Sequence, residues 1–422
     1  MLKGVQTRLI AHYILCEIVE KLTNFDDIFN SYISRYKLSG SDTKFIQNIV
    51  LNTMRYNLHV NKIILKYVKK NKNTQQNILL LSAITQLVFL DFKEYAVVNS
   101  SVEIAKLKNI NVYPGFINAV LKKIIKDKKK LKEIKINYDD LPQWFLQETS
   151  EINTKEKEDF LKTILKIPTL HIVFKNETLK KSFNLTYKET SKNSIYLDHH
   201  SKIKELPNYN NGDWWVQDYS TMLPLSLINN FEGKDIVDLC AAPGGKSFQV
   251  ISKGGNLDMY EISKNRTKTL QENLKRLRFN NNVFVTDSLK ISNNKKYDYV
   301  LVDAPCSSVG TIRRNPEIFF RKNKFEKEKL LLIQKKLLEK ASQITKKKGV
   351  IVYMVCSFFN IETVDQINSF LKKNNNFMIK KFHNNINTQG LIDNNGYINI
   401  KPKTIKDFNI DGFFAAQIIK ND

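Results

Sequence analysis

The sequence contains few cysteines, and their spacing excludes two common uses of this residue. Its 422 residues include 4 cysteines, Cys16, Cys240, Cys306 and Cys356, and none of them forms a CxxC pair. Their wide separation argues against a disulfide framework and indicates reduced thiols in the cytoplasm. It also argues against zinc, because no histidine has the spacing of a metal ligand, so no metal site is expected.

Long apolar runs and a leader segment are also missing. The most apolar run, "ILLLSAITQLVFL", starts at Ile78 and contains Ser82, Thr85 and Gln86, so it predicts a buried helix that is too short to span a bilayer. The start of the chain is interrupted by His12 and Glu17 and has no cleavage site of a signal peptide. We therefore expect no membrane partner.

Acidic residues are too few to balance the basic ones. There are 67 Lys and Arg against 42 Asp and Glu, which gives a net charge of +25. Such an excess favours a polyanionic partner, either nucleic acid or an anionic membrane, although solvated lysines would explain it as well. The hydrophobic fraction of 42% is sufficient for packed cores, and the length predicts two or three domains.

Apolar periodicity and composition divide the chain into four parts. Residues 1–126 are predicted to be all-helical, because apolar residues such as Ile46, Ile49, Val50 and Met54 recur at helical spacing. Residues 127–140 form a basic linker, residues 141–212 a small α+β segment with short strands, and residues 213–422 the last domain.

The last domain alternates short apolar runs with helical patterns. The runs are "DIVDLC", "LDMYE", "VFVTD", "YVLVD" and "GVIVYMVC", and the clearest helix lies at 325–344. This alternation predicts an α/β fold, a Rossmann-like, mostly parallel and doubly wound sheet. The carboxyl ends of such strands share one crevice, where ligands bind.

Each predicted strand ends in a chemically useful residue, in chain order Cys240, Glu261, Asp287, Asp303 and Cys356. The first strand runs into the turn "DLCAAPGGKS", where Gly244 and Gly245 allow a ligand to approach the backbone. Neither GxxxxGK[ST] nor GxGxxG is present, which argues against a P-loop and against a nicotinamide oxidoreductase. Carboxylates placed for a ribose, without a pyrophosphate site, favour S-adenosylmethionine.

The stretch "DAPCSSVGTIRRNPE" places Asp303 and Cys306 at one strand end, followed by Arg313 and Arg314, which suit phosphates or a base edge. With Cys356 at the next strand end, two thiols and a carboxylate share the crevice. A thiolate that adds to carbon 6 of a pyrimidine makes carbon 5 nucleophilic toward a methyl donor, and a base then removes the carbon 5 proton. The pyrimidine must be unstacked or single-stranded. Chemistry alone does not choose which cysteine attacks.

At these residues the sequence resembles the Sun/Fmu (RsmB-type) RNA cytosine-C5 methyltransferases along nearly its whole length. The similar segments are "LPQWFLQE", "GDWWVQDYST", "DLCAAPGGKS", "LVDAPCSSVGTIRRNPE", "VYMVCS" and "DGFFAAQIIK". Residues 1–126 resemble a NusB-type RNA-binding domain, especially in "VVNSSVEIAK" and "GFINAVLKKI". This combination is similar to the enzymes of 16S ribosomal RNA, and implies a monomer acting on a single-stranded loop or an unassembled subunit.

The resemblance also implies roles for individual residues. Cys356 would be the nucleophile, Cys306 would assist proton removal and release, and Asp303 would also touch the cytosine. Gln217, Asp218, Arg313 and Arg314 would bind the substrate. The S-adenosylmethionine site would comprise Cys240, Ala241, Ala242, Pro243, Gly244, Gly245, Lys246, Glu261, Arg266, Asp287 and Asp303.

Two departures from the family pattern flank the predicted nucleophile. Val355 stands before it where the family has Thr, and the acidic run that the family has after it is reduced here to Glu362. Two alternatives stay open within this reading. One is the same chemistry on transfer RNA or another RNA, and the other is a non-catalytic RNA-binding factor of ribosome assembly.

Overall fold

The computed structural model describes residues 3–21, 24–69, 73–198, 202–292, 294–320, 326–383 and 388–422. It divides the chain into two compact units. Unit 1 comprises Met1–Leu165 and Ile312–Lys324, and unit 2 comprises Lys166–Thr311 and Phe325–Asp422. Each unit is described by itself.

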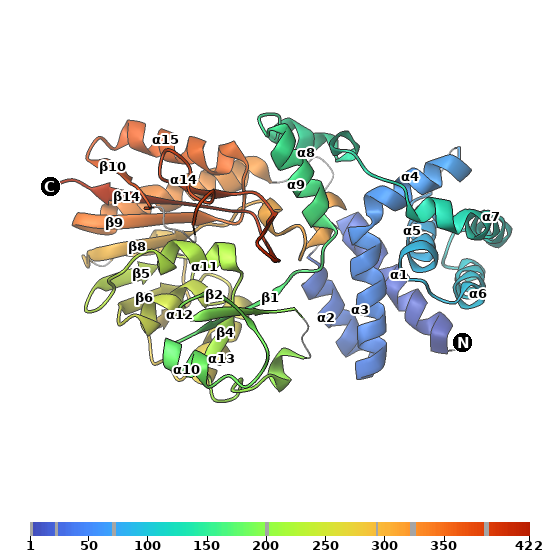
Figure 1. Cartoon of the computed structure of the whole chain (residues 1–422), viewed down its shortest axis with the longest axis horizontal. Coiled ribbons are helices and arrows are strands. Elements are labelled where there is room, and N and C mark those ends of the chain that lie inside the picture. The colour runs from blue at the N-terminus through green and yellow to red at the C-terminus, as the bar shows by residue number, and fades with distance from the viewer. Residues whose placement is uncertain are drawn as a thin grey trace. The chain divides into compact units, whose positions relative to one another are not determined.

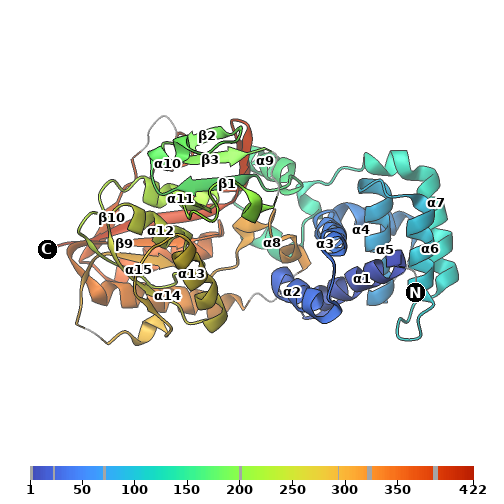
Figure 2. The same ribbon diagram turned by 90° about the horizontal axis from the view of Figure 1, so that it is seen from below.

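Unit 1 is helical, as expected for the first part of the chain. Its helices are α1 (Lys3–Lys21), α2 (Phe25–Tyr36), α3 (Gly40–Arg55), α4 (Asn57–Tyr67), α5 (Thr74–Ile84), α6 (Glu94–Ala105), α7 (Pro114–Lys132), α8 (Gln143–Glu148) and α9 (Thr154–Ile164). Helices α6 and α7 lie side by side (Figure 2). On α3, the side chains of Ile46, Ile49, Val50 and Met54 are fully buried, which confirms the predicted apolar face.

The compact units do not follow the boundaries predicted from composition. Helix α7 continues through the expected basic linker as far as Lys132, because lysine is a good helix former and Leu131 still packs in the core of unit 1. Helices α8 and α9 belong to unit 1, whereas the sequence pattern grouped them with the strands that follow.

A segment from the second half of the chain also belongs to unit 1. In Ile312–Phe320, Glu317 Oε1 accepts a hydrogen bond from the backbone N–H of Phe25 at 3.5 Å. Arg55 Nη2 donates to the carbonyl of Arg313 at 3.3 Å. The ring of Phe319 meets that of Phe145 edge to face, with centroids 5.8 Å apart. The segment that follows the Asp303–Cys306 motif is therefore part of the helical core.

Unit 2 is built on a large, mostly parallel sheet, which confirms the predicted fold class. Its strands are β5 (Asp235–Asp238), β6 (Asn256–Tyr260), β7 (Val283–Phe284), β8 (Tyr297–Asp303), β9 (Thr345–Val355), β10 (Phe377–Lys380), β11 (Ile398–Ile400) and β14 (Phe413–Lys420). The strand order is β10-β14-β9-β8-β5-β6-β7, and β11 pairs with β14. The pairs among β5 to β9 are parallel, whereas β14 runs antiparallel to β9, β10 and β11.

Both faces of this sheet are covered by helices. Helices α11 (Tyr219–Ser226), α12 (Gly245–Ser252) and α13 (Lys264–Arg276) lie on one face, and α14 (Lys327–Ile344) and α15 (Val364–Lys373) on the other (Figure 1). Successive strand residues alternate between the two cores: Ile236 packs with Phe248 of α12, and Val237 with Leu337 of α14. Burial on both faces explains why these strands are continuous apolar runs.

A small antiparallel sheet and a hairpin complete unit 2. The sheet has the order β2-β3-β1-β4, from β1 (Leu170–Phe174), β2 (Lys188–Ser191), β3 (Ser194–Leu197) and β4 (Trp214–Val216). Short elements α10 (Glu177–Lys181), β12 (Lys403–Ile405) and β13 (Phe408–Ile410) accompany it. The predicted strands "LHIVF" and "SIYL" are β1 and β3. In the described part of the chain, no helix combines the length and the apolar character that crossing a membrane requires.

Candidate active site at the strand ends of unit 2

The glycine turn connects the end of β5 to the start of α12. The buried carboxylate of Asp238 accepts from Ser247 Oγ at 2.7 Å and from the Cys240 N–H at 3.2 Å, which closes the loop on itself. Gly244 has φ of +114°, and a Cβ there would lie 2.1 Å from Phe248 Cζ, so only glycine fits. The Cys240 thiol lines this loop, and burial, followed by the charge of Asp238, raises its pKa well above the ordinary value.

Glu261 joins the glycine turn to the end of β6. Its buried carboxylate accepts from the N–H of Ser263 at 2.9 Å and from that of Ala242 at 3.3 Å. Arg266 lies 3.4 Å from Glu261 Oε2 and donates to the carbonyl of Ala242. Oε2 of Glu261 thus faces two donors, whereas Oε1 has one and retains a further lone pair that suits a ribose hydroxyl.

Exposed apolar side chains stand beside these carboxylates, and sequence reasoning did not single them out. Ile262 is 69% exposed just after β6, and Phe284 and Val285, at the end of β7, are 40% and 47% exposed. Asp287 is half-buried nearby in sequence and accepts from the Leu289 N–H at 3.0 Å. Carboxylates for a sugar beside apolar surface for a flat base are the groups that a nucleoside needs, so these residues fit S-adenosylmethionine.

Lys246 pairs with Asp303 at the end of β8, and its charge also acts on Cys356 at the end of β9. Its ammonium group is 2.7 Å from Asp303 Oδ2 and 5.0 Å from the ring centre of Phe413. Burial alone would lower the pKa of Lys246, but the charge of Asp303 raises it above the ordinary value. Burial raises the pKa of the Cys356 thiol to about 12, and the positive charge of Lys246 opposes that rise. The resemblance placed Lys246 in the cofactor loop and gave it no role toward Cys356.

Cys306 has the opposite electrostatic environment. Burial, followed by the negative charge of Glu362, raises the pKa of its thiol well above the ordinary value. Backbone contacts hold its loop against the Cys356 strand: the N–H of Ala304 donates to the carbonyl of Met354 and that of Gly310 to the carbonyl of Cys356, each at 3.0 Å. The two cysteines therefore lie on adjoining segments, and they differ in that the charge of Lys246 lowers the pKa of Cys356 whereas that of Glu362 raises the pKa of Cys306.

Gln217 and Asp218, which the resemblance assigns to the substrate, use their polar groups inside unit 2. Gln217 accepts from Trp215 Nε1 at 2.8 Å and donates to Gln249 Oε1 at 2.9 Å. Asp218 caps α11 through the N–H of Ser220 at 2.9 Å. Both side chains are buried, and their role toward the substrate stays a prediction.

Arg313 and Arg314 belong to unit 1 and not to the unit that carries the strand ends. Arg313 is fully buried and Arg314 is half-buried. A buried guanidinium suits packing in unit 1 better than contact with a phosphate, whereas the accessible part of Arg314 leaves its predicted contact open. The strand-end residues Cys240, Glu261, Asp303, Cys306 and Cys356 all lie within unit 2.

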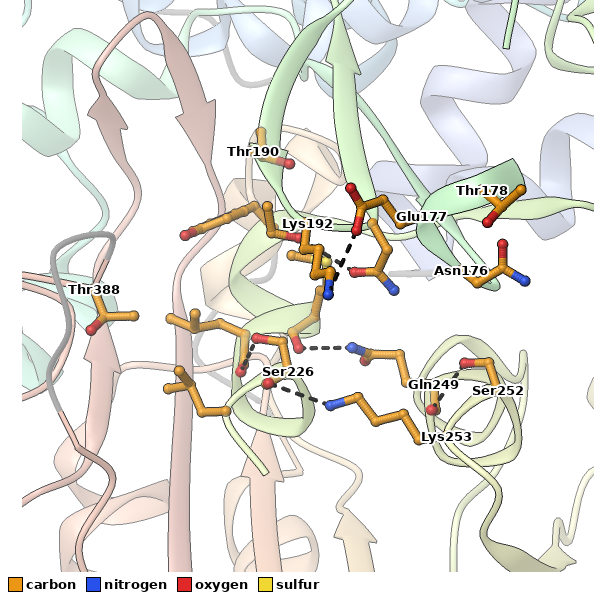
Figure 3. A pocket seen from close by; sticks show the side chains of 16 residues that line it. Asn176, Glu177, Thr178, Thr190, Lys192, Ser226, Gln249, Ser252, Lys253 and Thr388 are labelled. Carbon is orange, nitrogen blue, oxygen red and sulfur yellow. Dashed lines mark hydrogen bonds and ion pairs between the residues drawn. The ribbon is translucent and has the colours of Figure 1, made fainter. Parts of the chain in front are cut away.

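A separate pocket of about 580 Å³ opens at the far end of α12 from the glycine turn (Figure 3). Several of its polar side chains already bond to one another or to the backbone. Lys192 lies 3.6 Å from Glu177, Gln249 donates to the carbonyl of Met222 at 3.0 Å, and Lys253 donates to that of Leu225 at 2.7 Å. Across the described residues, no group of three or more His, Cys, Asp or Glu is arranged to hold a metal ion.

Two family profiles match the chain. Residues 225–419 match the family described as 16S rRNA methyltransferase RsmB/F, and residues 5–126 match the NusB family. Among curated proteins, the "Ribosomal RNA small subunit methyltransferase B" of Photorhabdus laumondii is 26% identical over 406 residues, which cover 91% of this chain and 92% of that protein.

Solved structures share the fold. The crystal structure of PH0851 aligns with a TM-score of 0.73 at 20% identity and covers 100% of this chain and 99% of its own. NSun6 from Pyrococcus horikoshii aligns with a TM-score of 0.57 at 18% identity and covers 67% and 98%, respectively. The chain therefore combines a methyltransferase domain of the RsmB/F type, over residues 225–419, with a helical domain of the NusB type, over residues 5–126.

Proposed function

We propose that this enzyme methylates carbon 5 of one cytosine in small-subunit ribosomal RNA and that the sulfur of Cys356 bonds covalently to carbon 6 during the reaction. The observation that carries the proposal is the Lys246–Asp303 ion pair at 2.7 Å, which holds a cation whose charge opposes the rise in the pKa of the Cys356 thiol that burial causes. We also propose that the enzyme acts as a monomer in the cytoplasm, where its four free thiols stay reduced.

The residues of unit 2 divide the reaction between them. The Cys356 thiolate attacks carbon 6, and carbon 5 becomes electron-rich as the ring accepts the electron pair. Asp303, held by Lys246, lies at the same strand ends and contacts the cytosine. S-adenosylmethionine supplies an electrophilic methyl group, and its donor sulfur leaves as a neutral thioether. Cys306 then assists removal of the carbon 5 proton, and the electron pair of that C–H bond expels Cys356 as a thiolate.

The cofactor residues support this assignment through their contacts with one another. Glu261 and Ala242 are joined by a hydrogen bond, which fixes the carboxylate for the ribose against the turn beside the methionine part. Arg266 adds an ion pair with Glu261. Cys240 only lines the loop, and we expect its replacement by alanine to be tolerated better than that of Cys356.

Bisulfite mapping tests the reaction and the RNA target. A strain that lacks the protein should lose one 5-methylcytosine from 16S ribosomal RNA, wild-type protein should restore it, and the Cys356→Ala variant should not. Loss of a methylated cytosine from transfer RNA instead would contradict the proposed target. No loss from either RNA would contradict the proposed reaction.

Removal of the charge at Lys246 should move the pH dependence of methylation. Because the Cys356 pKa lies near 12, the thiolate population and the rate increase with pH across the neutral range. Lys246→Met removes the cation that opposes the rise in the Cys356 pKa. The increase of rate with pH should therefore move to higher pH, and the rate at neutral pH should fall by about 10-fold or more. Single-turnover methylation between about pH 6.5 and 9.5 measures this. Lys246→Arg should recover part of the rate, and an unchanged pH profile in Lys246→Met would contradict the role.

Affinity for RNA should fall steeply with salt, because contacts with phosphates release counterions. Lys122 and Lys126 are exposed on one face of α7 and are candidates for such contacts. Changing both to glutamine should reduce the slope of log K against log salt by about 2. Filter binding across a salt series measures the slope, and Lys372→Gln with Lys373→Gln on α15 is a control of equal charge. A slope near zero in the wild type would argue against phosphate-dominated binding.

A further inference from the structure

A buried carboxylate joins the loops of the two reactive cysteines. Glu362 is 3% exposed and lies in the short 3₁₀ helix Asn360–Glu362 that follows Cys356. Its Oε1 accepts from the backbone N–H of Ser307 at 2.8 Å, and its Oε2 accepts from Ser307 Oγ at 2.5 Å. Ser307 directly follows Cys306. One carboxylate on the β9 side therefore accepts from both the N–H and the hydroxyl of Ser307 on the β8 side.

Further contacts fix the same junction. Gln334 of α14 donates through Nε2 to Glu362 Oε1 at 3.2 Å and to the carbonyl of Pro305 at 3.0 Å. Ser307 Oγ also lies 3.2 Å from Ser357 Oγ, so its one hydroxyl proton can be donated either to Glu362 or to Ser357. The two residues that directly follow the cysteines thus bond to each other across the strand ends.

We propose that Glu362 is a positioning residue that locks the Cys306 loop to the Cys356 loop through Ser307. This inference rests on the proposed function of the two thiols. It adds Glu362 as a further residue that the proposed reaction needs. It also gives a physical reason why the two cysteines are not interchangeable.

The charge of Glu362 also distinguishes the two thiols. Burial raises the pKa of the Cys306 thiol first, and Glu362, Cys356 and Asp303 raise it further. For Cys356, burial and the carboxylates of Asp303, Asp411 and Asp218 raise the pKa, and only Lys246 lowers it. The carboxylate thus favours the protonated form of Cys306, so that Cys306 does not compete in the first attack, while the lysine favours the thiolate at Cys356.

Glu362→Gln tests this inference because glutamine keeps an acceptor oxygen for Ser307 and removes the charge. In the full-length protein, we expect kcat for methylation to fall about 10- to 100-fold, while KM for S-adenosylmethionine changes less than about 2-fold. Without RNA or cofactor, alkylation of Cys306 by iodoacetamide, mapped by mass spectrometry, should rise about 10-fold relative to that of Cys356. A loss of packing alone would raise the reactivity of both thiols together.

Ser307→Ala tests the same contact from the Cys306 loop and removes only one hydroxyl. It therefore serves as the second variant if Glu362→Gln does not fold. It should lower kcat with little change in KM. Asp365→Asn, an exposed carboxylate on α15, is the control of equal charge and should match the wild type. If Glu362→Gln keeps the wild-type kcat and alkylation ratio, the inference is wrong. If the wild type methylates no RNA, the proposed function fails instead, and the alkylation ratio still decides the role of Glu362.

Discussion

Replacement of Cys356 by alanine should abolish methylation. The variant removes the thiol whose rise in pKa the charge of Lys246 opposes, and without covalent addition carbon 5 of cytosine is too weak a nucleophile to attack the methyl donor. We expect a loss in kcat/KM of at least about 10⁴-fold, whereas binding of S-adenosylmethionine should change little, because no cofactor contact is attributed to the Cys356 side chain. Transfer of a labelled methyl group to ribosomal RNA and calorimetric titration with the cofactor measure the two effects.

A matched variant separates the loss of this thiol from the loss of any thiol. Cys16 is buried in unit 1, and Cys16→Ala should retain the wild-type rate. Full activity of Cys356→Ala would assign the nucleophile to another residue, with Cys306 the first to examine.

Replacement of Cys306 by alanine should trap the enzyme on its RNA. In the proposed sequence Cys356 forms its bond to carbon 6 without Cys306, but elimination of Cys356 needs removal of the carbon 5 proton. The half-buried Cys306 thiol lies on the adjoining loop, tied to the Cys356 carbonyl through Gly310. Without it, attack proceeds and release does not. A protein–RNA species stable on denaturing gels should accumulate, and turnover should fall by about 10²-fold or more.

The double variant Cys306→Ala with Cys356→Ala is the decisive control, because it should give no such species. Absence of the species in the single variant would remove the release role of Cys306. Its persistence in the double variant would show that the covalent bond is not made by Cys356.

The sequence was sufficient to predict the parallel sheet and the residues at its strand ends. Strands buried on both faces are continuous apolar runs, and the carboxyl ends of parallel strands share one edge, so Glu261, Asp303 and Cys356 could be grouped without a structure. The helix around Ile46 to Met54 followed in the same way from its period.

Contacts between distant side chains were beyond such reasoning. The bonds between Ser307 and Glu362 join residues 55 positions apart, and no pattern in either segment indicates the other. The burial of Arg313 depends on a segment that packs into unit 1, although the motif that contains it starts at a strand of unit 2. The local sequence predicted that Arg313 contacts RNA, because the residues that bury it lie far away in the chain.

The inclusion of Ile312–Lys324 in unit 1 has a consequence for how this protein can be cut and recombined. The chain crosses from one unit to the other at three places, after Leu165, Thr311 and Lys324. A shortened chain that starts at Lys166 would therefore keep Glu317 and Phe319 but lose Phe25 and Phe145, the neighbours they contact. The helical part is thus not an interchangeable cassette: a chimaera that exchanges it must carry the matching 312–324 segment from the same parent.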